Sequence, residues 1–104
     1  MADTRNNVYV SAASVWEIAI KRRTGKLVFH GMAASAISAN GFLELPIGSA
    51  DAEQAGGLAW QHGDPFDRML VAQAMRAGLV IVTSDRSIQA YDQVAHMAAD
   101  RMTP

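Results

Sequence analysis

The apolar residues in the first part of the chain are spaced as on one face of an α-helix. Val15, Ile18 and Ala19 form a stripe within a segment that we expect to be helical from about residue 12 to 24. The run "VYVS" at residues 8–11 directly precedes it and is β-branched and aromatic, which is typical of a strand. The chain is therefore predicted to pass from a strand straight into a helix.

The clearest helical pattern covers residues 64–78. Asp64 is a favourable N-cap, Pro65 suits the first helical position, and Gly78 lies just past the end. The apolar stripe of this segment predicts a largely buried helix. The next run, "LVIVTS" at 79–84, is continuously apolar, which is typical of a parallel strand covered on both faces.

Weaker signals predict further elements between and after these segments. The alternating residues 42–47 predict a short edge strand, because Pro46 cannot donate to a ladder. Ser49 or Asp51 is the expected cap of the helix that follows. Three weaker helices are expected, over residues 31–40, 49–60 and 85–100. Helices that alternate with strands predict an α/β layered fold, in a single domain over residues 1–104.

The composition narrows the class of protein. Half of the 104 residues are hydrophobic, which is enough for one small core. The net charge of -1 excludes a global basic field, so nucleic acid could bind only through a local patch. The absence of cysteine excludes disulfides and thiol catalysis. We find no apolar run of the roughly 18–20 residues that cross a bilayer and no signal peptide, so we expect a cytoplasmic domain without a membrane partner.

Three acids fall near the carboxyl ends of the predicted strands, where ligands bind in parallel α/β sheets: Glu17, Asp67 and Asp85. Each also has a structural explanation. Glu17 could form a capping box with Ser14, unless Ser11 is the N-cap; Asp67 could complement the helix dipole, and Asp85 could cap the next helix. If the three acids converge, their repulsion requires a cation, and an all-oxygen ligand set suits Mg²⁺ or Mn²⁺.

Three blocks of the sequence, taken together, resemble the PIN domain and, within it, the VapC-like toxins of type II toxin–antitoxin systems. The blocks are "SAASVWEIAIKRRTGKL", "LPI" and "HGDPFDRMLVAQAMRAGLVIVTSDRSIQAY", and the resemblance runs from about Val8 to Tyr91. It implies a three-layer α/β/α fold and a metal-dependent endoribonuclease that hydrolyses RNA phosphodiester bonds. It also implies Mg²⁺ or Mn²⁺ as cofactor, a cognate antitoxin as partner, and a homodimer.

The resemblance assigns roles to individual residues. It implies that Glu17, Asp67 and Asp85 hold the metal and carry catalysis. Three further residues would have supporting roles: Ser14, Asp64 as the helix cap, and Thr83 as the polar neighbour of Asp85.

The sequence departs from the family pattern at its start. PIN domains begin with a central strand that supplies a first metal-binding Asp, whereas only seven residues precede the run at 8–11 here. Asp3 echoes that motif, but no apolar strand comes before it. We therefore expect an incomplete PIN-like domain that lacks one of four acids, with unpaired edges on the strands at 8–11 and 79–84. The alternative function is a catalytically impaired remnant that binds an antitoxin or a second copy of itself.

Basic residues near the acids are candidates for RNA contact. Lys21, Arg22 and Arg23 could guide an RNA backbone, or could simply be the solvated end of a helix. Arg68 could contact phosphate or pair with a neighbouring acid. His62, in the loop before Asp64, is expected to be a bystander.

Overall fold

The computed structural model describes residues 7–28, 30–83, 86–91 and 96–98. The chain divides into two compact units, Met1–Ile47 and Gly48–Pro104. None of the described helices is long and apolar enough to cross a bilayer.

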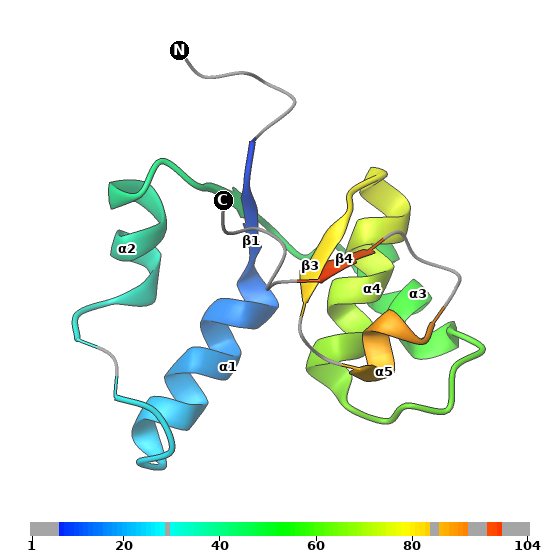
Figure 1. The fold of residues 1–104 in the computed structure, drawn as a ribbon, viewed down its shortest axis with the longest axis horizontal. Coiled ribbons are helices and arrows are strands. Elements are labelled where there is room, and N and C mark those ends of the chain that lie inside the picture. The colour runs from blue at the N-terminus through cyan, green and yellow to red at the C-terminus, as the bar shows by residue number, and fades with distance from the viewer. Residues whose placement is uncertain (1–6, 29, 84–85, 92–95, 99–104) are drawn as a thin grey trace. The chain divides into compact units, whose positions relative to one another are not determined.

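The first unit contains two strands and two helices: β1 (Tyr9–Ser11), α1 (Ala12–Arg23), α2 (Ala33–Ala39) and β2 (Leu43–Leu45). Figure 1 shows α1 continuing directly from β1, as the sequence predicts. The Ser11 hydroxyl accepts a hydrogen bond of 3.0 Å from the Ala13 N–H, so the last strand residue is also the N-cap of the helix. β1 and β2 pair in parallel, with Tyr9 opposite Leu43.

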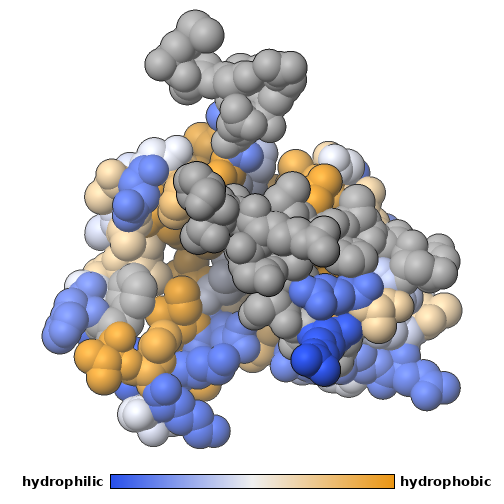
Figure 2. Space-filling model, viewed as in Figure 1, coloured by the Kyte–Doolittle hydropathy of each residue, from blue (hydrophilic) through white to orange (hydrophobic). Residues whose placement is uncertain are grey.

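The core of the first unit is small. Ala13 of α1 and Ile37 of α2 are its buried apolar residues. Many large apolar side chains of this unit are exposed, including Trp16 (62%) and Val28 (81%). Figure 2 shows apolar side chains on the surface over α1 and the segment that follows it.

The second unit contains the remaining elements: α3 (Ser49–Gly57), α4 (Pro65–Ala77), β3 (Ile81–Thr83), α5 (Arg86–Gln89) and β4 (His96–Ala98). α3 packs against α4, and α4 against β3 (Figure 1). The core joins Val71 and Ala74 of α4 to Ile88 of α5. β3 and β4 pair in parallel, with Ile81 opposite His96.

The predicted ends of α4 are confirmed by its capping contacts. The Asp64 carboxylate accepts the N–H groups of Phe66 at 2.9 Å and of Asp67 at 3.2 Å. At the other end Gly78 has φ +67°, the left-handed conformation that favours glycine. The buried residues of α4 lie in the middle of the helix: Val71, Ala72, Gln73 and Ala74.

Two of the weaker predictions need correction. Among the described residues of the segment 85–100, where one helix was expected, Arg86–Gln89 form helix α5 and His96–Ala98 form strand β4. The sequence of β4 has little strand propensity, so the pairing with β3 decides the conformation of these residues. The helix expected over 49–60 begins after Gly48 and ends at Gly57. Asp51 contributes to its cap, because its carboxylate accepts the Gly48 N–H at 2.8 Å.

The α/β class is confirmed, with parallel strand pairs as predicted. Within the described residues, the strands form two separate two-stranded sheets, β1–β2 and β3–β4. β1 and β3 each have one strand neighbour in that part of the chain.

Candidate metal centre

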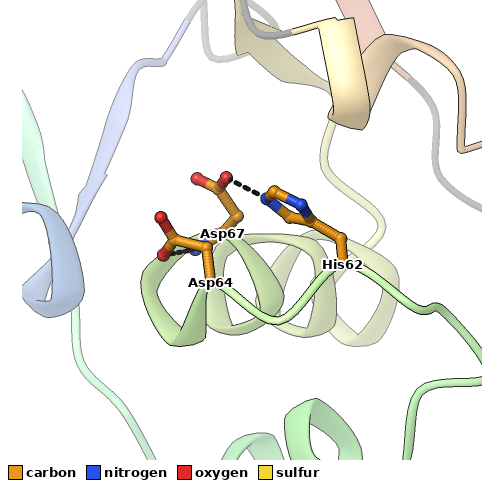
Figure 3. Close-up of side chains that lie close together, drawn as sticks. All are labelled: His62, Asp64 and Asp67. Carbon is orange, nitrogen blue, oxygen red and sulfur yellow. Dashed lines mark hydrogen bonds and ion pairs between the residues drawn. The ribbon is translucent and has the colours of Figure 1, made fainter.

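Three metal-ligating side chains meet at the N-terminus of α4: His62, Asp64 and Asp67 (Figure 3). One ligand atom from each lies within 4.8 Å of the others. The local sequence explains the two acids, because an N-cap and a residue three positions later both belong to the first turn of a helix. His62 comes from the loop that enters this turn.

The imidazole of His62 contacts the carboxylate of Asp67. Their Nε2 and Oδ2 atoms are 2.7 Å apart, and the two side chains are 27% and 16% exposed. In the tautomer with hydrogen on Nε2, the ring donates to the carboxylate. The structure places the His62 ring against Asp67, and the expectation that His62 is a bystander in the chemistry stays a prediction.

The Trp60 ring lies next to the imidazole, tilted by 40° to it, and stacks on Tyr91. The rings of Trp60 and His62 have centroids 4.8 Å apart, and the Trp60 and Tyr91 rings stack at 4.7 Å with an 18° angle between planes. Trp60 and Tyr91 both pack against the core of the second unit. The stack therefore connects the orientation of His62 to the packed core.

The guanidinium of Arg68 is hydrogen-bonded to main-chain carbonyls. Its Nε donates to Ala55 at 2.9 Å, and its Nη1 donates to Trp60 at 2.6 Å and to His62 at 3.1 Å. Its Nη2 donates to Gly56 at 3.3 Å and Leu58 at 2.9 Å. These five bonds match the five N–H donors of an arginine. In the structure, the N–H groups of Arg68 donate to main-chain carbonyls of the chain itself. Contact of Arg68 with RNA stays a prediction.

Glu17 lies on α1, in the first unit. Its carboxylate is 3.3 Å from the Lys21 ammonium one turn later, and its side chain is 30% exposed. Since Ser11 is the N-cap, Glu17 is not the acid of a capping box with Ser14, which lies within α1. The helical Glu–Lys spacing is a common surface pairing.

The basic cluster beside Glu17 forms the end of α1. Arg22 donates to the carbonyl of Gly31, while Lys21 pairs with Glu17 and Arg23 is exposed. RNA contact by these side chains stays a prediction.

Asp85 lies outside the described residues. Thr83 is the last residue of β3, where its backbone is opposite Ala98. The set of Glu17, Asp67 and Asp85 therefore stays a prediction, whereas the structure brings Asp67 together with Asp64 and His62.

The donor chemistry of the cluster fits a divalent cation. Ligand atoms that share one ion at about 2.0–2.2 Å lie within roughly 4.4 Å of one another, so the 4.8 Å spread requires only small movements. Carboxylate oxygens suit Mg²⁺ and Mn²⁺, and imidazole suits softer first-row metals. Asp64 uses Oδ1 for the helix cap, which leaves its second oxygen as the candidate ligand.

The chain has a mixed α/β fold with parallel strand pairs and packed helices. It also has a candidate metal centre in its second unit. The family model of the PIN domain matches residues 1–94, and the chain belongs to this family. PIN domains are generally nucleases and typically use divalent metals. No curated protein matches the chain.

Proposed function

We propose that this protein is a metal-dependent endoribonuclease of the VapC-like toxin type, which hydrolyses RNA phosphodiester bonds with Mg²⁺ or Mn²⁺. The observation that carries the proposal is the convergence of His62, Asp64 and Asp67 in a member of a family of nucleases. The resemblance supplies Glu17 and Asp85 as further ligands.

The residues of the cluster have distinct roles in this proposal. Asp67 supplies a carboxylate to the site, and His62 orients it through the 2.7 Å contact. Asp64 holds the first turn of α4 in place through two backbone N–H groups. A divalent ion bound there supplies an activated water and stabilises the charge that develops on the phosphate.

The first experiment compares RNA cleavage and Mn²⁺ binding by the full chain and its Asp67→Asn variant. Glu53→Gln is the matched control, because Glu53 is an exposed acid of the same unit outside the cluster. We expect the wild type and the control to bind Mn²⁺ in calorimetry and to cleave RNA with it. Asp67→Asn should lose both properties. Equal metal-dependent cleavage by Asp67→Asn and wild type would refute the assignment.

A second experiment tests Glu17 as a ligand. Glu17→Gln removes the carboxylate and its ion pair with Lys21, whereas Lys21→Gln breaks the ion pair but keeps the Glu17 carboxylate. We expect Glu17→Gln to weaken Mn²⁺ binding and Lys21→Gln to leave it unchanged. If the two variants bind Mn²⁺ equally, Glu17 is not a ligand.

The second candidate function is an interaction module that is completed by a partner. Its supporting observation is the pair of two-stranded sheets, in which β1 and β3 each have one strand neighbour among the described residues. Unpaired strand edges favour pairing with another chain. The partner under this hypothesis is a second copy of the chain or a cognate antitoxin.

Analytical ultracentrifugation of the purified chain distinguishes an interaction module from a domain that folds without a partner. A self-associating chain that binds no Mn²⁺ would favour the interaction module. A stable monomer that unfolds cooperatively would contradict both self-association and the need for a partner.

A further inference from the structure

The side chain of Arg68 donates to several main-chain carbonyls of the loop between α3 and α4. α3 ends at Gly57, and the residues that follow have no helix or strand until Pro65. Carbonyls at a helix end lack partners within the helix. Arg68 donates to two carbonyls of α3, those of Ala55 and Gly56, and to three carbonyls of the loop.

Consecutive residues of α4 hold His62 at two different places. Asp67 contacts the imidazole Nε2, and Arg68 donates to the His62 carbonyl. Arg68 also donates to the carbonyl of Trp60, whose ring lies against the imidazole. Residues of the first turn of α4 therefore hold both the backbone of residues 60–62 and the ring of His62 in place.

We propose that Arg68 is a positioning residue of the metal centre. By fixing the carbonyls of residues 55–62, it places the His62 imidazole where it orients the Asp67 carboxylate. The proposal rests on the proposed function, because it takes Asp67 as a metal ligand. A lysine cannot replace Arg68 here, because its three donors do not form the planar fork that reaches five carbonyls.

Arg76 is the matched control, because it distinguishes the positioning role of Arg68 from a role in joining the two helices alone. It also joins α4 to α3, through a 2.7 Å bond from Nη1 to Asp51 Oδ1. That bond lies away from the carbonyls of residues 55–62. Arg68→Lys and Arg76→Lys therefore both weaken the contact between these helices, whereas only Arg68→Lys releases the loop.

The readout is the His62 Nε2–H proton, observed by NMR in the full chain with ¹⁵N-labelled histidine. The chain has three histidines, and a His62→Gln variant assigns the signal. We expect a protected proton in the wild type and in Arg76→Lys. In Arg68→Lys its exchange with water should be faster by at least about 10-fold, and Mn²⁺ affinity should fall by about 10- to 100-fold, as for other groups that orient metal ligands.

A measurement on the wild type keeps the proposal testable if Arg68→Lys fails to fold. A guanidinium with all donors bonded should show separate Nη1 and Nη2 signals, since rotation about its Nε–Cζ bond is hindered. Averaged signals from Arg68 would overturn the proposal.

Two further outcomes would also overturn it. One is an equally protected His62 proton in Arg68→Lys and wild type. The other is a lost His62 signal without any loss of Mn²⁺ affinity. If the wild type binds no Mn²⁺, the proposed function fails, and the role of Arg68 in a metal centre fails with it. The NMR signal then reports only whether Arg68 orients His62.

Discussion

Arg76 of α4 and Asp51 of α3 form a hydrogen-bonded ion pair, with Nη1 and Oδ1 2.7 Å apart. The other oxygen of the same carboxylate accepts the Gly48 N–H at 2.8 Å. One acid therefore both caps its own helix and joins it to the next. The Gly48 N–H, followed by Arg76, lowers the pKa of Asp51, while burial acts in the opposite direction.

The lowered pKa of Asp51 predicts a loss of stability in acid. The ionised carboxylate favours the folded state, so its contribution is complete above the unfolded pKa of 3.8. The contribution is lost as the pH falls through the lower folded value. Asp51→Asn should therefore lower the melting temperature at neutral pH and reduce its decline in acid. Circular dichroism measures both effects.

Glu53→Gln is the control for Asp51, because it removes an exposed carboxylate from the same helix. It should leave the acid dependence nearly unchanged. A melting-temperature difference between Asp51→Asn and wild type that is the same at neutral and acidic pH would contradict the prediction.

Two substitutions at Asp64 separate capping from metal binding. Asp64→Ala should destabilise the fold by about 1 kcal/mol, and Asp64→Ser should recover most of that loss, because a hydroxyl also accepts the first backbone N–H groups. Neither variant should recover Mn²⁺ affinity, because both lack the second carboxylate oxygen. Denaturation and calorimetry measure the two properties. Full Mn²⁺ affinity in Asp64→Ser would show that Asp64 is only a cap.

Alanine at Gly78 should destabilise the protein by about 1 kcal/mol, because the residue has φ +67°. An added Cβ would meet no atom within 4 Å, so the cost comes from the backbone conformation alone. Gly56→Ala, within α3, should instead stabilise by about 0.5 kcal/mol or more. Equilibrium denaturation compares the two, and the same sign for both would disprove the argument.

Ile88 should contribute strongly to stability, because it anchors the four-residue helix α5 in the core. It is 2% exposed and belongs to the cluster with Val71 and Ala74. Ile88→Ala should cost about 2–5 kcal/mol in the free energy of unfolding. Val80→Ala, at a 54% exposed position, should cost less than about 0.5 kcal/mol. Similar losses in both variants would show that α5 is not packed as described.

The parts of the fold that were predictable have causes within a few neighbouring residues. Ser11 ends a strand and caps α1, while Asp64, Pro65 and Gly78 define both ends of α4. The same local signals place Asp64 and Asp67 at one helix end, and these are two of the three residues of the candidate metal centre. The roles of Glu17 and Asp85 rest on the family resemblance and stay predictions.

The sequence by itself determined where α1 and α4 begin and end, because capping and helical periodicity act over one or two turns. Only the tertiary structure decided that His96–Ala98 is a strand, since its partner β3 lies more than ten residues earlier. It also decided which groups His62 and Arg68 contact. A loop histidine and a helical arginine carry no local signal of their partners, which become apparent only when α3, α4 and their loop are packed together.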